Sequence, residues 1–187
     1  IYHGYNKVML PHKFKIAVGG CPNNCAKPDL NDLGIIGQLI PQYSETLCKG
    51  CKKCQVKDAC PVGASKIVDG VLKIEEEKCN HCGRCVGKCP FQAIPEGKYA
   101  YKIYVGGRWG KKIACGQALN TLLYSEKEVF DVIERAILLF KEQGYAGERF
   151  SDTIARIGFE KTEDCLLHGD LLERKAEILA APIYVAN

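Results

Sequence analysis

Two cysteine-rich segments of similar sequence lie near the middle of the chain, and they constrain the fold more than any other feature. Residues 48–61 read CKGCKKCQVKDACP, and residues 79–90 read CNHCGRCVGKCP. The first three cysteines of the two segments align at an offset of 31 residues, and the fourth cysteine with its proline aligns at an offset of 29. The chain therefore contains an internal duplication, whose first copy carries two extra residues.

The spacing of these cysteines is typical of cubane iron-sulfur clusters. Three thiolates two residues apart on a tight loop can bind three corners of one cubane, while the fourth cysteine, followed by proline, binds the other cluster. The pattern predicts two ligand sets. These are Cys48, Cys51, Cys54 and Cys89 for one [4Fe-4S] cluster, and Cys79, Cys82, Cys85 and Cys60 for the other.

Zinc is the alternative metal, with Cys48 and Cys51 paired to Cys79 and Cys82. The 27 intervening residues exceed the about 15 to 20 usual for such a site. Zinc would also need neither the third cysteine nor the repeated Cys-Pro. Ten of the twelve cysteines fall in short-spaced groups, which favours metal centres over disulfides. This in turn predicts a reducing, cytoplasmic compartment.

Between the two copies, Asp69-Gly70 is flanked by alternating apolar residues, which predicts a β-hairpin over residues 66–74. With this hairpin and both cysteine motifs, residues 44–97 resemble a bacterial-type ferredoxin domain with two [4Fe-4S] clusters. The two extra residues before Cys60 are the one departure from the pattern, and we expect them to enlarge a loop.

The segments outside the duplication predict an α/β domain. Three apolar stretches with the character of strands lie at residues 14–18, 33–40 and 99–110, and the third strand ends in a double glycine. Helical periodicity follows over residues 125–144, 150–158 and 162–182, with a capping box at Ser125 and Glu128 and a break at Gly169. We expect an α+β protein in which residues 1–43 and 98–187 form one α/β domain, interrupted by the ferredoxin-like insert at 44–97.

Composition excludes few classes of protein. The chain is 47% hydrophobic and 26% charged, which is typical of globular proteins, and it contains no apolar run of about 18 residues that would span a membrane. The formal charge of +4 is balanced by about −2 for each of two clusters, so the lysines do not indicate nucleic-acid binding. The chain begins at Ile1 and its one methionine is Met9, which we interpret as a fragment of a longer polypeptide.

A further pair of cysteines, Cys21 and Cys25, lies in the segment VGGCPNNCAKP at residues 18–28. By itself the pair is compatible with two structural thiols, half of a zinc site or half of an iron-sulfur site. Its context is more informative. GGCPNNCAKPDLNDLGIIG, and beyond the insert YKIYVGGRWG and residues 128–158, resemble the sulfite and nitrite reductases that contain sirohaem and a [4Fe-4S] cluster. The likeness spans roughly residues 12–160, and the insert is similar to that of the dissimilatory and anaerobic branches.

This resemblance implies roles for the residues of the pair. Cys21 and Cys25 would bind a third [4Fe-4S] cluster, and the Cys25 thiolate would also bridge to the sirohaem iron. Asn23 and Asn24 would donate hydrogen bonds to cluster sulfur or to sirohaem carboxylates. The family motif has an earlier cysteine pair, and because no cysteine precedes Cys21, we expect its partners upstream of Ile1.

Basic residues follow the double glycine of the segment YKIYVGGRWG. Arg108, Lys111 and Lys112 would pair with carboxylates of the macrocycle, or else are solvated loop charges. Cys115 and Cys165 have no partner at ligand spacing, and we interpret them as buried or free thiols. No catalytic or substrate-binding residue is assigned.

The function implied by the resemblance is the six-electron reduction of sulfite to sulfide. Electrons would come from a donor subunit or domain, enter the two ferredoxin-type clusters and pass to the cluster coupled to sirohaem. Nitrite in place of sulfite is one alternative, and a non-catalytic electron-transfer module is another. We expect residues 1–187 alone to hold two clusters, to lack sirohaem and to be inactive.

Overall fold

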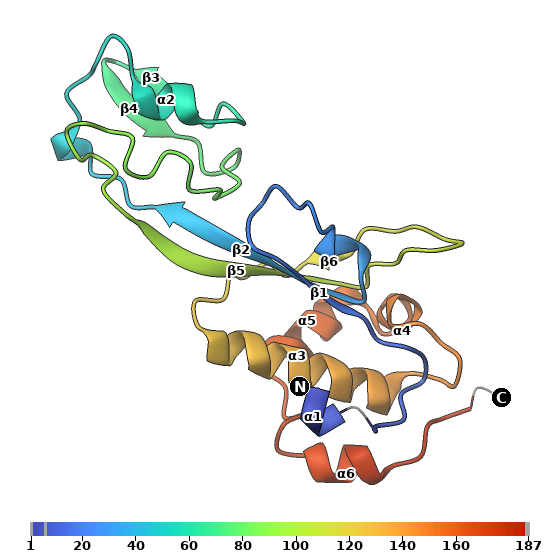
Figure 1. Ribbon diagram of the computed structural model, residues 1–187. Helices are drawn as coiled ribbons and strands as arrows, with labels where there is room; N and C mark the ends of the chain where they lie inside the picture. The colour runs from blue at the N-terminus through green and yellow to red at the C-terminus, as the bar shows by residue number, and fades with distance from the viewer. Residues whose placement is uncertain (1, 6, 186–187) are drawn as a thin grey trace. The chain divides into compact units, whose positions relative to one another are not determined.

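The computed structural model describes residues 2–5 and 7–185, and it mixes helices and strands as an α+β fold, confirming the predicted class (Figure 1). Two compact units divide the chain. One comprises Ile1–Gly19, Cys25–Ile36 and Tyr101–Asn187, and the other comprises Gly20–Asn24 and Gly37–Ala100. The sequence pattern predicts the boundaries of the insert at residues 44 and 97.

A four-stranded sheet has the order β1-β2-β5-β6. Its strands are β1 (Ile16–Gly19), β2 (Leu33–Pro41), β5 (Gly97–Val105) and β6 (Gln117–Ala118). β1 and β2 are parallel, with Ile16 opposite Leu33, whereas β5 and β6 are antiparallel, with Tyr104 opposite Ala118. β5 ends at the double glycine within the predicted stretch 99–110, because Gly106 has a φ of 79° and ends the extended conformation.

The predicted helices are confirmed with small shifts in their ends. They are α3 (Glu126–Gln143), α4 (Phe150–Ile157), α5 (Phe159–Leu167) and α6 (Lys175–Ala180), and a short α1 (Tyr2–Tyr5) precedes them. At α3 both halves of the capping box form, since the Ser125 side chain accepts from the Glu128 N–H and the Glu128 carboxylate accepts from the Ser125 N–H. The break near Gly169 separates α5 from α6.

Helix α3 packs across one face of the sheet and forms the main core (Figure 1). Its apolar stripe buries Ile133, Ile137 and Phe140 against residues such as Leu33 of β2 and Ile103 of β5. Phe140 and Phe150 are fully buried, with ring centroids 5.4 Å apart in an edge-to-face arrangement. Each ring contributes about 1.5–3 kcal/mol by burial, so these two side chains are major contributors to this core.

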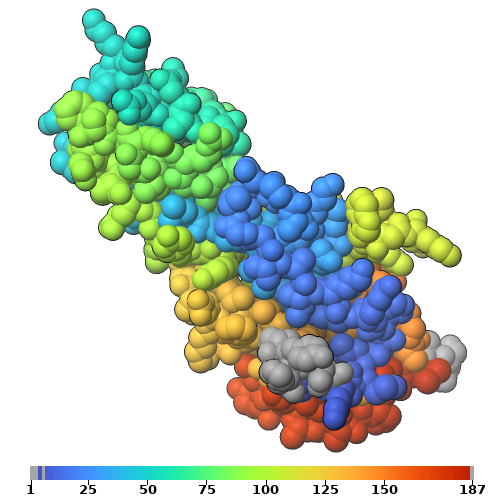
Figure 2. Space-filling model, viewed as in Figure 1, coloured from blue at the N-terminus to red at the C-terminus, as the bar shows by residue number. Residues whose placement is uncertain are grey.

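The cysteine-rich unit has a much smaller apolar core, formed by Val56, Leu72 and Ile94. The predicted hairpin is confirmed as β3 (Ser65–Val68) and β4 (Val71–Ile74), and Asp69 and Gly70 both have positive φ, as a type I′ turn requires. A short helix, α2 (Gln55–Ala59), contains the residues that lengthen the first copy. Long side chains stand out from the surface of the segment at residues 45–60 (Figure 2).

No helix in the part of the chain that the structure describes is both long enough and apolar enough to cross a membrane.

Candidate functional site

Four cysteines from both copies of the duplication meet at one pocket in the cysteine-rich unit. Its lining includes Cys60 from the first copy and Cys79, Cys82 and Cys85 from the second. Cys60 ends α2, whereas the other three lie on the loop that follows β4. The structure therefore brings together the same four thiols that the spacing predicted for one cluster.

The electrostatics of this pocket favour thiolates that are bound to a cation. Burial raises the pKa of Cys85 to about 11, and the neighbouring thiols of Cys79, Cys82 and Cys60 add to the rise. Burial likewise raises the pKa of Cys79. Several thiolates crowded in a partly buried space repel one another, and an iron core that binds them removes this cost. The donor set thus fits a cubane cluster.

Backbone N–H groups are directed at the thiol of Cys60. The Ala64 N–H donates to Cys60 Sγ at 3.2 Å. Burial acts to raise the pKa of this thiol, but the N–H groups of Ser65, Val62 and Ala64 outweigh burial and lower it. N–H groups that stabilise a thiolate in this way are typical of iron-sulfur sites.

The remaining ligand set lies beside the small core of the same unit. Cys48, Cys54 and Cys89 pack against that core, and Cys51 is half-buried on the loop between Cys48 and Cys54. Backbone N–H groups of Leu72 and Gly50 lower the pKa of the Cys48 thiol. In this second ligand set, too, backbone N–H groups of other residues stabilise a cysteine thiolate.

A buried hydroxyl without a hydrogen bond lies next to these thiols. Tyr43 packs against the same core, and within the described residues its Oη has no hydrogen-bond partner. Burial raises the pKa of Tyr43, and the adjacent Cys48 thiol adds to the rise. An orphaned donor next to a ligand thiol fits a cluster whose sulfur would accept its hydrogen bond. Sequence spacing gave no signal for Tyr43.

The two copies also share their backbone conformation. Gly50 and its counterpart His81 are both left-handed, with φ of 59° and 53°, as are Gly63 and Gln92, with φ of 65° and 59°. After each Cys-Pro the same turn forms, since the Gly63 N–H donates to the Cys60 carbonyl and the Gln92 N–H donates to the Cys89 carbonyl. The left-handed conformation is unusual for residues with a Cβ such as His81 and Gln92. The geometry of the loop therefore determines their backbone conformation, rather than the preference of the residue type.

Within the described ranges, no three His, Cys, Asp or Glu side chains are close enough to hold a single metal ion. The four thiolates of a cubane bind four different irons, and they therefore stand further apart than the ligands of one ion.

The separate cysteine pair of the sequence analysis, Cys21 and Cys25, lies on the exposed loop after β1. Asn23 and Asn24 lie between the two cysteines, and the Asn24 N–H donates to the Cys21 carbonyl at 3.2 Å in a tight turn. Asn24 itself is left-handed, with a φ of 55°. The loop thus presents its thiols to the surface.

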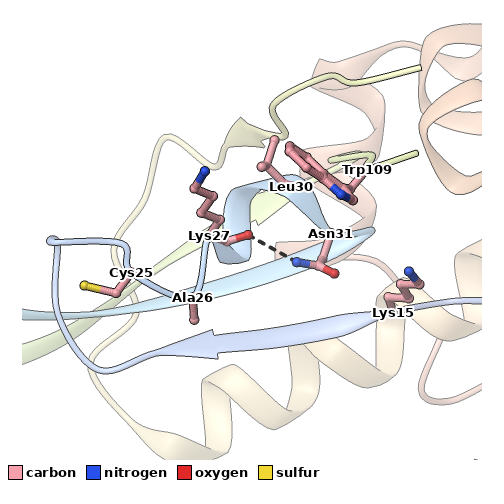
Figure 3. A pocket seen from close by; sticks show the side chains of 7 residues that line it. All are labelled: Lys15, Cys25, Ala26, Lys27, Leu30, Asn31 and Trp109. Carbon is pink, nitrogen blue, oxygen red and sulfur yellow. Dashed lines mark hydrogen bonds between the residues drawn. The ribbon is translucent and has the colours of Figure 1, made fainter. Parts of the chain in front are cut away.

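Cys25 also lines an open pocket of about 280 Å³ (Figure 3). Two lysines, Lys15 and Lys27, and the exposed ring of Trp109 share this lining. Lys27 Nζ lies 5.7 Å from the centroid of the Trp109 ring. Cations beside a thiol and a flat ring suit an anionic ligand with an extended aromatic system. Of the residues that line this pocket, only Cys25 was predicted from the sequence to be a site residue. Lys27 and Trp109 lie in the two segments that carry the family resemblance.

Gly107 allows the turn beneath this pocket to approach the sheet. A Cβ at Gly107 would lie 2.2 Å from the Asp29 carbonyl oxygen and 2.5 Å from that of Asn31. The short 3-10 helix η1 (Pro28–Leu30) therefore sits directly on the backbone that follows β5. The double glycine of the sequence is required by this contact.

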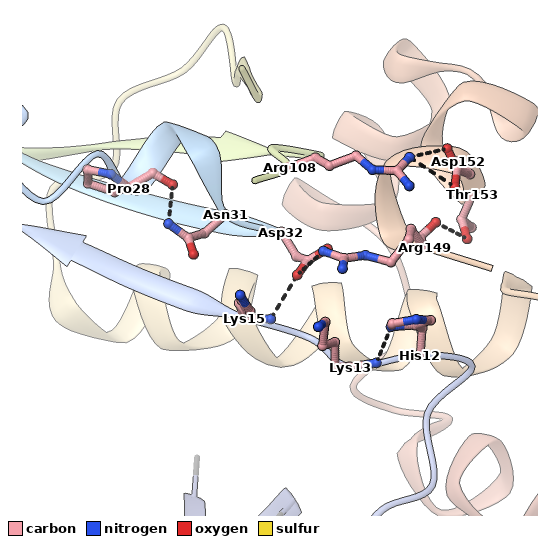
Figure 4. A network of polar contacts seen from close by, with 10 residues as sticks. All are labelled: His12, Lys13, Lys15, Pro28, Asn31, Asp32, Arg108, Arg149, Asp152 and Thr153. Carbon is pink, nitrogen blue, oxygen red and sulfur yellow. Dashed lines mark hydrogen bonds and ion pairs between the residues drawn. The ribbon is translucent and has the colours of Figure 1, made fainter. Parts of the chain in front are cut away.

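A buried ion pair holds the base of the same region (Figure 4). Asp32 is fully buried and accepts from Arg149 Nη2 at 3.0 Å and from the Lys15 N–H at 3.0 Å. The Asp32 carbonyl in turn accepts from the Gly106 N–H. Through its carboxylate and its carbonyl, Asp32 thus ties together the segment before β1, the residue that precedes α4 and the turn after β5.

The basic residues predicted to pair with the macrocycle have different surroundings. Arg108 Nη1 forms an ion pair with Asp152 Oδ1 at 3.1 Å (Figure 4). Lys111 and Lys112 are exposed on the loop that follows. Cys115, at the end of this loop, is exposed rather than buried.

Paired cysteine loops of this kind, on a fold that also carries the pair Cys21 and Cys25, are typical of iron-sulfur oxidoreductases of the electron-transfer type. The chain belongs to the nitrite and sulphite reductase 4Fe-4S domain family, whose model matches residues 1–172. This is the family predicted from the CPNNC segment and its flanks.

Two curated relatives illustrate the family. The chain is 32% identical over 153 residues to the coenzyme F420-dependent sulfite reductase of Methanocaldococcus jannaschii, covering 81% of this chain and 24% of that protein. It is 39% identical over 108 residues to one of the subunits of the anaerobic sulfite reductase of Salmonella typhimurium, covering 54% of this chain and 31% of that relative. The chain thus spans less than a third of the length of either relative.

Among solved structures, the fold resembles that of dissimilatory sulfite reductase I, with a TM-score of 0.62 and 24% sequence identity. The match covers 88% of this chain and 46% of the other. At this identity the likeness supports the fold alone.

Proposed function

We propose that this chain is the iron-sulfur part of a sirohaem-dependent sulfite reductase that works in the cytoplasm. In this proposal residues 44–97 form a ferredoxin domain that relays electrons from a donor subunit or domain. The two clusters lie on the ligand sets predicted above, and Cys21 and Cys25 complete a third cluster coupled to sirohaem in the full-length protein. Sulfite bound to the sirohaem is reduced to sulfide.

The proposal depends most on the meeting of Cys60 with Cys79, Cys82 and Cys85 in one pocket. In two-cluster ferredoxins the fourth cysteine of one motif binds the cluster of the other motif, and Cys60 lies where this arrangement requires it. The pocket with Lys15, Lys27 and Trp109 beside Cys25 supports the sirohaem part, since lysines can pair with carboxylates of a macrocycle. Without its clusters the cysteine-rich unit has little apolar core, so loading with iron should also stabilise it.

Iron and acid-labile sulfide analysis of the anaerobically reconstituted chain tests the ligand sets. We expect about eight irons in the wild-type chain and about four after Cys60→Ser. Cys165→Ser is the matched control, because Cys165 lies outside both sets, and it should retain all eight. An unchanged iron content after Cys60→Ser would contradict the proposed ligands.

The proposed binding of sirohaem is tested separately in the full-length protein. A visible chlorin spectrum that disappears after Cys25→Ser supports the reductase function. A full-length protein that carries only the two ferredoxin-type clusters would instead favour an electron-transfer module. Steady-state reduction of sulfite against nitrite decides the substrate.

A further inference from the structure

Four exposed lysines surround the first cysteine loop and form what we term the lysine loop. They are Lys49, Lys52, Lys53 and Lys57. No ion pair involves any of them within the described residues, although three other lysines of the same unit are paired, namely Lys66 and Lys78 with Glu75, and Lys73 with Glu45. Four like charges within nine consecutive residues repel one another, so folding alone gives no reason for them.

The internal duplication provides a control for their role. The second loop has Asn80 and Gly83 at the positions of Lys49 and Lys52, whereas Arg84 keeps the positive charge at the position of Lys53. Both loops nevertheless share a left-handed residue directly before the second cysteine, Gly50 in the first copy and His81 in the second. A loop of this geometry thus needs no lysine at these two positions, and we infer that the charges of Lys49 and Lys52 serve a purpose other than ligand placement.

An apolar side chain accompanies the lysine loop. Leu47 directly precedes Cys48 and is 43% exposed. An apolar contact inside a polar, solvent-accessible rim is the usual arrangement of protein interfaces. Oppositely charged surfaces raise the rate at which such partners meet.

We propose that the lysine loop is the docking surface for an acidic electron-donor protein, which delivers electrons to the cluster held by the first cysteine loop. One electron leaves the reduced flavin or cluster of the donor and enters this cluster, and no bond is made or broken. The proposal rests on the proposed function and adds two properties to it, the entry point of the electrons and the charge of the partner.

Stopped-flow reduction of the reconstituted clusters provides the test, with flavodoxin hydroquinone, a small acidic flavoprotein, as the donor. We expect the second-order rate to fall as salt is added and to fall at least about threefold in Lys49→Gln/Lys52→Gln at low ionic strength. Carbodiimide cross-linking followed by peptide mass spectrometry should join the flavodoxin to lysines of residues 49–57, which reports docking without any turnover.

Lys66→Gln/Lys78→Gln is the matched control, because it removes the same charge from the same unit at lysines that are already ion-paired. Its rate with flavodoxin should remain within about twofold of wild type. Reduction by methyl viologen, a small cation that needs no docking surface, should not slow in either variant.

The outcomes separate the two proposals. Normal reduction by methyl viologen with equal flavodoxin rates in all three proteins would overturn the docking surface and leave the proposed function intact. No cluster reduction by either donor would refute both. Dimerisation, or retention on a DNA oligonucleotide, that is lost in Lys49→Gln/Lys52→Gln while the flavodoxin rate is unchanged would assign the loop to that other partner.

Discussion

Replacing Tyr43 by phenylalanine removes one buried oxygen that lacks a hydrogen bond in the described residues and lies beside the Cys48 thiol. In the loaded protein we expect this hydroxyl to donate to the Cys48 sulfur. A hydrogen bond to a charged acceptor is worth about 1.5–3 kcal/mol. A reduced cluster carries one more negative charge than an oxidised one, about −3 against about −2, so the bond strengthens on reduction.

If about a third to a half of that energy appears only on reduction, the variant loses about 1 kcal/mol of preference for the reduced state. For a one-electron couple this corresponds to a potential about 40 mV more negative. Protein-film voltammetry of the two-cluster chain should therefore show one couple shifted by Tyr43→Phe and the other unchanged. Without metal the variant should be as stable as wild type or slightly more so, because it buries no unsatisfied hydroxyl.

Tyr99→Phe is the control for this experiment, since Tyr99 belongs to the same unit but is 74% exposed. It should move neither potential. The reasoning is refuted if Tyr43→Phe leaves both couples in place, or if it shifts the couple that Cys60→Ser removes.

Three further predictions concern the unit that contains α3. Asp32→Ala should lower the free energy of unfolding by about 3–5 kcal/mol in urea titrations, because it leaves a buried guanidinium without its partner; a loss below about 1 kcal/mol would contradict this. Gly107→Ala should cost more than about 2 kcal/mol, since its Cβ would collide with backbone oxygen, whereas Gly20→Ala, which meets nothing within 4 Å, should be nearly neutral. The Arg156 guanidinium lowers the pKa of Glu148. Glu148 therefore stabilises the fold above the unfolded-state pKa of about 4.3, and this stability is lost as the pH falls through the lower folded value. Glu148→Gln should flatten the fall in thermal midpoint over that acidic range, and an equally steep fall would exclude the pair as its cause.

The elements that local residue patterns encode could be predicted from the sequence. The capping box at Ser125, the Asp69-Gly70 hairpin and the cysteine loops each involve residues a few positions apart, where spacing fixes geometry. The double glycine marked the end of β5 in the sequence, and the positive φ of Gly106 gives the physical reason. Cys25 was found by its motif, whereas Lys27 and Trp109 reach the same pocket from segments about 80 residues apart.

By itself, the sequence determined the two iron-sulfur motifs, the family and most helices and strands, because each follows from short-range periodicity or ligand spacing. Only the tertiary structure decided that Lys27 and Trp109 line one pocket with Cys25, that the Tyr43 hydroxyl has no partner within the described residues and that Asp32 is buried against Arg149. These contacts join residues far apart in the chain, and their existence depends on which groups lose water together when the cores form.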